Sequence, residues 1–191
     1  MSSASLRRWQ NDRAGELDQL AQAHAAVGGT GPGRRWATRQ VNYAYATLLS
    51  SHFQGFCRDL HTESVDHIVS AVSPAIIRNV LWVEFTLSRQ LDKGNPNPGN
   101  IGSDFNRLGL SFWSDVQSED SRNEERQSKL EHLAAWRNAI AHQDFDPSNL
   151  APATLTLPTV RRWRRALNAL AVSFDRVMAR HIHSITGSSP W

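Results

Sequence analysis

The chain has little of several things on which whole classes of protein depend. Among its 191 residues there is one cysteine, Cys57, which excludes an intrachain disulfide framework or a cysteine-based metal site and favours a reducing compartment. Cys57 lies in an apolar stretch, so we expect a small core residue there. No run approaches the ~18 apolar residues that cross a bilayer, and no apolar segment follows the first residues as in a secretion signal. We therefore expect a cytoplasmic protein without a membrane partner.

Metal-ligand spacings are also missing. His181 and His183 lie two residues apart, ~200° around a helix, and cannot hold one ion without ligands from elsewhere. His52, His61 and His67 have no carboxylate at a metal-binding spacing. We therefore predict no metal and no cofactor.

Apolar residues recur at helical spacing along most of the chain, and no stretch reads as a convincing strand. A first helix is expected from about Ser5 to Ala26, followed by a glycine-rich connection over 28–33. That connection lacks the Gly-Lys-Ser/Thr ending of a phosphate-binding loop. A long helix follows from about Arg35 to Leu60, and residues 63–72 either extend it or begin a shorter one.

The second half of the chain predicts four further segments. Residues 75–91 hold many β-branched side chains, but about seventeen residues without a turn signal favour a well-buried helix. A loop over 93–100 precedes a short helix, capped by Ser103 or Asp104, that either packs over the domain or supplies a dimer contact. A capping box at 121–124 opens a helix that ends by about Phe145. The last helix starts at Pro158 or Thr159, and its inward stripe comprises Val160, Trp163, Leu167, Leu170, Phe174, Val177 and Ile182.

The charge is small overall, at +3, but uneven. From residue 161 onward six arginines face one acid, Asp175, a balance of +5 that leaves −2 for residues 1–160. Such a cluster suits a polyanion such as RNA, and a solvated helix face explains it equally well.

The segment Trp136-Arg-Asn-Ala-Ile-Ala-His142, late in the predicted helix 121–145, gathers groups that could do chemistry. Asn138 and His142 lie four residues apart, hence ~40° apart on one helix face. Arg137 falls in an otherwise apolar stripe. Burying a guanidinium there costs free energy unless it pairs with an anion or lies at a hydrated interface between subunits.

A second stretch, Val41 to Leu60, is an apolar run that ends in Phe-Gln-Gly-Phe-Cys-Arg-Asp-Leu. With the Arg-Asn-x-x-Ala-His motif it resembles the RiboL-PSP type of the HEPN superfamily over roughly residues 36–185. The resemblance implies an all-α, HEPN-like antiparallel helical bundle, here one domain over 1–191 with the N-terminal helix and connection as an extension. Gln54 departs from the acidic residue common at that position in the family.

The resemblance also implies an activity, a metal-independent endoribonuclease. In it His142 would transfer protons, Arg137 would stabilise charge on the phosphate, and Asn138 would orient the imidazole or bind phosphate. Family members commonly pair two motif helices across a two-fold axis, so a homodimer acting on an RNA substrate is expected. The usual bacterial setting is a toxin–antitoxin or anti-phage system, with a possible cognate antitoxin protein as partner.

Two alternatives stay open at this point. Arg137 and His142 could be ordinary structural residues, with Arg137 paired to an acid such as Glu84. Alternatively, a non-catalytic HEPN module could bind RNA, nucleotide or a protein partner through the same cleft.

Overall fold

The structure, a computed structural model, describes residues 1–27 and 34–191, so the predicted connection at 28–33 lies outside the described residues. The described part is helical and contains no strand, which confirms the predicted all-α fold. None of its helices combines the length and the apolar composition that crossing a membrane requires.

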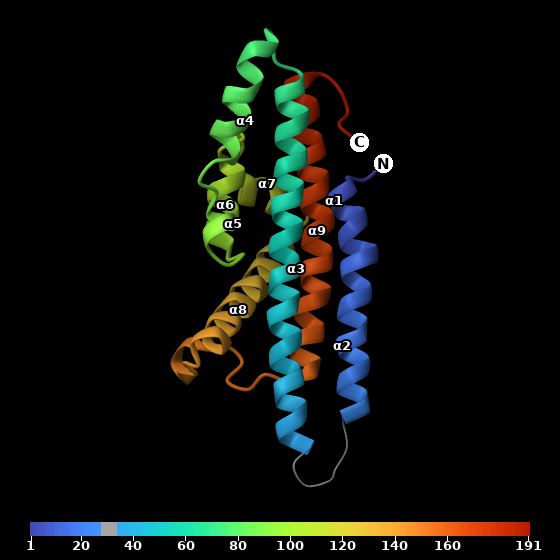
Figure 1. Cartoon of the computed structure of the whole chain (residues 1–191), viewed down its shortest axis with the longest axis vertical. Coiled ribbons are helices and arrows are strands. Elements are labelled where there is room, and N and C mark those ends of the chain that lie inside the picture. Colours follow the sequence, from blue (N-terminus) through green and yellow to red (C-terminus); the bar gives the residue numbers. More distant parts are fainter. Residues whose placement is uncertain (28–33) are drawn as a thin grey trace.

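Three long rods lie side by side and form the body of the molecule (Figure 1). The first joins α1 (Ala4–Arg8), a π-helical turn (Trp9–Arg13) and α2 (Ala14–Val27); the others are α3 (Arg34–Ser70) and α9 (Leu157–Thr186). The first rod runs antiparallel to both, whereas α3 and α9 are parallel because the chain between them folds back through the shorter helices. The expected N-terminal helix is thus confirmed, and residues 63–70 extend α3.

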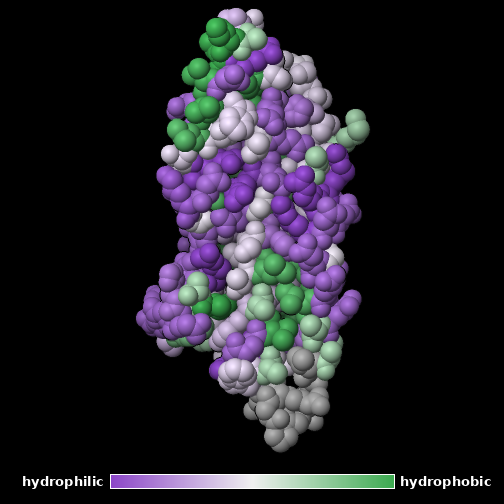
Figure 2. Space-filling model, viewed as in Figure 1, coloured by the Kyte–Doolittle hydropathy of each residue, from purple (hydrophilic) through white to green (hydrophobic). Residues whose placement is uncertain are grey.

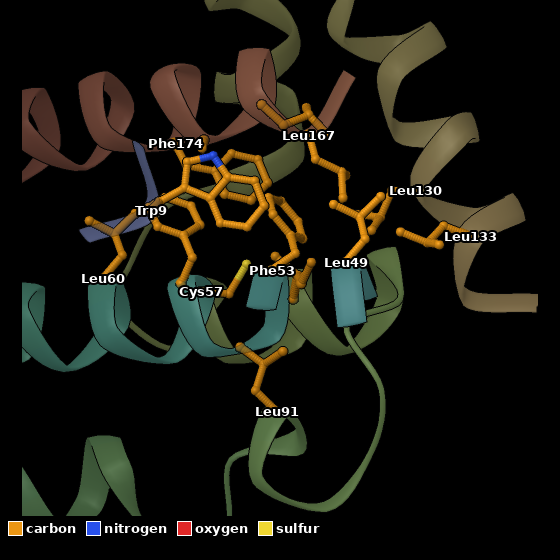
Figure 3. Close-up of a cluster of buried hydrophobic side chains, with 14 of the residues drawn as sticks. Trp9, Leu49, Phe53, Cys57, Leu60, Leu91, Leu130, Leu133, Leu167 and Phe174 are labelled. Atoms are coloured by element: carbon orange, nitrogen blue, oxygen red, sulfur yellow. The ribbon is translucent and has the colours of Figure 1, made fainter. Parts of the chain in front are cut away.

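A cluster of aromatic rings fills the space between the three rods (Figure 3). Trp9 of the first rod lies edge-on to Phe53 of α3 with ring centroids 5.5 Å apart, and Phe174 of α9 lies 5.9 Å from Phe53. Cys57 is fully buried beside them, as predicted, and burial raises the pKa of its thiol well above the ordinary value. The N-terminal helices therefore share one core with α3 and α9.

Residues 75–91 depart from the prediction in two ways. A 3-10 turn (Ala75–Ile77) leads into α4 (Arg78–Thr86), and the helix then breaks, with Leu87 extended and Ser88 at φ 61°, before α5 (Gln90–Lys93). The expected burial was also wrong, because α4 packs mainly along α3 and leaves most of its apolar side chains exposed, with only Leu81 and Phe85 packed against the core (Figure 2). The large exposed ones are Ile76, Ile77, Val80, Trp82, Val83 and Leu87.

The predicted loop over 93–100 is confirmed only for residues 94–97, and the predicted cap at Ser103 or Asp104 was wrong. α6 runs from Pro98 to Asn106, because the Asn97 side chain accepts from the Asn100 N–H at 2.8 Å and proline suits the first helical position. Asp104 instead caps α5, accepting the N–H groups of Gln90 and Leu91, both at 2.8 Å.

The helix that carries the motif, α8 (Asn123–His142), follows α7 (Phe112–Glu119) and runs antiparallel to α9. The predicted capping box is absent, since the helix starts at Asn123 and no side chain caps it. Asp120 organises the turn before it by accepting from the Arg122 backbone N–H at 3.0 Å. α9 starts at Leu157 after Thr156, and every residue of its predicted inward stripe is buried.

Candidate functional site

The last turn of α8 forms one wall of a small pocket. Gln143 adopts the left-handed conformation (φ 55°) that ends the helix at His142 and reverses the chain. Residues 144–150, with a 3-10 turn at Pro147–Asn149, then fold back beside the helix. The resulting pocket holds about 330 Å³, and its polar lining residues are Asn138, His142, Asp144, Asp146 and Asn149.

The three predicted site residues lie at this end of the helix but not in equivalent positions. Asn138 and His142 are exposed and line the pocket together, as their four-residue spacing predicted. Arg137 is half-buried and is not part of the pocket lining. It contacts the site by donating from Nη1 to the Asn138 Oδ1 at 3.4 Å. Among the described residues no carboxylate lies within ion-pair distance of Arg137, so the pairing with Glu84 is not seen.

Asn138 is held from outside the helix by a buried asparagine that sequence reasoning missed. Asn95 Nδ2 donates to Asn138 Oδ1 at 3.0 Å and also reaches the Ala134 carbonyl at 3.4 Å. The oxygen of the Asn138 amide accepts from Asn95, whereas its Nδ2 group makes no hydrogen bond within the described chain and stays available to a ligand.

The loop that carries Asn95 is in turn fixed to α3. Gln54 donates to the carbonyls of Leu91 at 2.6 Å and Gly94 at 2.7 Å. Gln54 is the position at which the chain departs from the acidic residue of the resemblance. The amide can donate two hydrogen bonds to carbonyls where a carboxylate cannot donate any, so here the glutamine has a positioning role.

Two carboxylates in the pocket were also missed. Asp146 caps the 3-10 turn, and the backbone N–H of Ser148, at 2.9 Å, lowers the pKa of its carboxyl below the ordinary value. Asp144 makes no side-chain bond in the described part of the chain. The Asp-Pro-Ser-Asn sequence at 146–149 is a turn signal that could have revealed the first. No signal shows that the turn folds back over α8.

A larger cavity of about 870 Å³ lies on the other side of the same turn, between α2, α3 and α8. Its aromatic wall is formed by Tyr43 and Phe145, stacked with centroids 5.4 Å apart, and by Trp136. Leu150 lines both cavities. The last turns of α8 therefore contribute side chains to both cavities.

The pocket can perform two kinds of chemistry. The Asn138 amide N–H groups, with the nearby Arg137 guanidinium, can bind an anion, and the imidazole and carboxylates can exchange protons. Across the described residues, no group of three histidine, cysteine or acidic side chains is arranged to hold a metal ion.

Comparison with known proteins gives one finding. No curated protein and no solved structure matches the chain significantly. The family model for RiboL-PSP-HEPN matches residues 37–180, which run from the first turn of α3 into α9 and include both the early helix and the motif. α1 and α2 precede the matched region, although Trp9 packs in the same core. The chain therefore belongs to the RiboL-PSP-HEPN family.

Proposed function

We propose that this protein is a metal-independent endoribonuclease that cuts RNA at a cleft between two copies of α8. HEPN domains are frequently ribonucleases, so family membership supports a module of this kind. The observation that carries the proposal is the joint exposure of His142 and the Asn138 amide in one pocket, next to Arg137, which has no acidic partner among the described residues.

The chemistry assigns each residue a task. RNA cleavage without a metal needs a group that takes the 2′-hydroxyl proton, one that protonates the leaving 5′-oxygen, and positive charge on the transition state. Imidazole suits the proton work because its ordinary pKa of ~6.5 lies near working pH. Arg137 stays protonated and matches phosphate oxygens. The Asn138 oxygen accepts from Asn95, which favours phosphate binding by the amide N–H groups over orientation of the imidazole.

We propose a homodimer because a partner helix would supply a second imidazole, the side chain best suited to proton transfer near neutral pH. One pocket contains a single histidine, and two motif helices across a two-fold axis would bring a second to the same phosphate. We expect a solution mass of twice the chain by light scattering and a specific activity that falls when dilution separates the copies. A monomer with undiminished activity at every dilution would contradict the shared cleft.

The decisive test compares two histidines of α8. His142→Ala should lower the cleavage rate on the order of 10²- to 10⁴-fold, as expected for loss of a general acid or base. His132→Ala is the matched control, because His132 lies on the same helix outside the pocket. The readout is the appearance of 2′,3′-cyclic phosphate ends, with EDTA present in a parallel sample. A folded His142→Ala protein that cuts as fast as wild type would eliminate the proposed role.

The biological setting that we propose is a toxin–antitoxin or anti-phage system, with a cognate antitoxin as a possible partner. Expression should then arrest growth, and Arg137→Ala or His142→Ala should relieve the arrest. Equal arrest by the wild type and both variants would argue against a toxic nuclease.

A second candidate is a non-catalytic HEPN module that binds RNA, nucleotide or a protein partner. Asp144 and Asp146 favour it, because two carboxylates in the pocket repel a phosphate. This candidate predicts binding without cleavage, and Asp144→Asn would then tighten the binding of an anionic ligand. Under the nuclease proposal, cleavage ends are detected in the same samples.

A further inference from the structure

A local excess of positive charge lies in a groove between α8 and α9, away from the pocket of His142. Two hollows of about 350 Å³ and 600 Å³ share Arg122, Arg126 and Ala169, so they adjoin on one face, and we call them together the groove. The bottom of the groove is lined by Ala166 and Ala169 of α9, whose small side chains leave space above them. Its cationic lining residues are Arg122, Arg126, Lys129, Arg162, Arg165 and Arg176.

The net charge of the groove equals that of the whole chain. Its six cations face three acids, Glu119, Asp120 and Glu125, a balance of +3. The chain as a whole also carries +3, so the rest of the molecule is neutral on balance. A recessed surface with this local excess attracts anions, and the attraction weakens with salt.

The two banks of the groove differ in how far their cations are neutralised. On the α8 bank Asp120 pairs with Arg122 at 2.9 Å and Arg126 at 2.8 Å, and Glu125 pairs with Lys129 at 2.6 Å. On the α9 bank Arg176 is paired with Glu119 at 3.4 Å. By contrast, Arg162 meets only the Thr159 hydroxyl at 3.3 Å, and Arg165 is exposed. Neither has an acidic partner in the described part of the chain.

The groove also points toward the motif. Arg137 follows Arg126 by eleven residues, about 20° around α8 and roughly 16 Å along it. A strand lying along the groove would thus reach Arg137, the member of the motif that lies outside the His142 pocket. From Arg162 to Arg176 the α9 bank extends for roughly 21 Å, long enough for several consecutive phosphates.

The geometry points to this groove as the surface that holds the sugar–phosphate backbone of single-stranded RNA, with Arg162 and Arg165 binding phosphates. The inference rests on the proposed function for the identity of the polyanion. A bilayer is a poorer fit, because the cations line a recess between helices and large apolar side chains to insert beside them are missing from the lining.

The test measures the salt dependence of RNA binding with the whole chain. A short single-stranded 2′-O-methyl RNA is the probe, because it lacks the free 2′-hydroxyl and cannot be cut by the proposed reaction. Each phosphate contact to a single strand contributes about 0.7 to the slope of log K against log salt. The double variant Arg162→Gln/Arg165→Gln should therefore reduce the magnitude of the slope by roughly 1.4.

The matched control removes two arginines elsewhere. Arg7→Gln/Arg58→Gln makes the same change in net charge at exposed positions on α1 and α3, and it should leave the slope unchanged. Equal slopes for the groove variant and wild type would overturn the inference, as would tighter binding of the matching single-stranded DNA, poly-glutamate or anionic vesicles than of the RNA. Circular dichroism verifies that both variants fold.

The outcome is separable from that of the nuclease proposal. RNA bound through the groove but never cleaved supports this inference and contradicts the nuclease. Cleavage that depends on His142, with the slope unaffected by Arg162 and Arg165, contradicts this inference and supports the nuclease.

Discussion

The centre of the bundle and the end of α8 use the same residue types for opposite purposes. At the centre His61 is fully buried, with its Nε2 3.2 Å from the Asp104 carbonyl, and burial lowers the pKa of the imidazole to about 4. At the end of α8, His142 is exposed and lines a pocket. The first imidazole is kept neutral by its surroundings, whereas the second is open to solvent and to any ligand in the pocket.

The carboxylates of the two regions show the same contrast. Asp104 is buried, and its two carboxylate oxygens accept hydrogen bonds from the backbone N–H groups of the first two residues of α5. Asp144 is exposed in the pocket without such bonds in the described chain. The difference teaches that burial, more than residue type, separates structural polar groups from those free to act. Substitutions in the two regions should therefore differ in their cost to stability.

Removing an aromatic ring from the centre should cost the most. Phe174 is fully buried, and its ring centroid lies 4.7 Å from that of Phe112. Phe174→Ala should therefore lower the free energy of unfolding by about 3–5 kcal/mol. His142→Ala, on the exposed side of the comparison, should change it by less than about 0.5 kcal/mol. Urea denaturation of both variants measures the difference, and similar costs would break the comparison.

Acid should act on the centre through His61. The unfolded chain takes up a proton near pH 6.5, whereas the folded protein resists it until about pH 4. The contribution of His61 to stability is therefore complete above pH 6.5 and is lost as the pH falls toward 4, by roughly 3 kcal/mol. Denaturation midpoints across this range should fall less steeply in His61→Gln than in wild type. Parallel pH profiles would show that another group is responsible.

The two regions meet at Asn95, whose loss should affect both stability and activity. Asn95→Ala removes the hydrogen bond to the Asn138 side chain, so the Asn138 amide is no longer fixed in the pocket. We expect the free energy of unfolding to fall by about 1–2 kcal/mol. We also expect slower RNA cleavage. Asn11→Ala, a change on the exposed side of the first rod, is the control. A destabilised Asn95→Ala protein with full cleavage activity would mean that Asn138 needs no positioning.

The exposed face of α4 gives the smallest effect. Val80 is 68% exposed and Val65 of α3 is fully buried. Val65→Ser should cost about 1–3 kcal/mol because it places an unpaired hydroxyl in the core. Val80→Ser should stay within about 0.5 kcal/mol. An equal loss for both would show that the α4 face is covered in solution and belongs with the core.

Sequence reasoning went furthest where the signal was local and repeated. The inward stripe of α9 and the long α3 followed from apolar spacing alone. The shared face of Asn138 and His142 followed from their four-residue spacing on a helix. It failed at 75–91, where a continuous apolar pattern suggested burial, because the pattern says nothing about how many neighbours a helix has. The single domain over 1–191 and the roles of Arg137, Asn138 and His142 stay predictions.

By itself the sequence determined the helical class, the family and the helix that carries the motif, because side chains a few residues apart fix these features. Tertiary structure decided which groups meet that motif: Asn95 holding Asn138, Asp144 and Asp146 closing the pocket, and Arg162 and Arg165 facing α8. These neighbours are far apart in the chain or separated by a reversal. Their meeting depends on the directions and packing of whole helices, which no local pattern specifies.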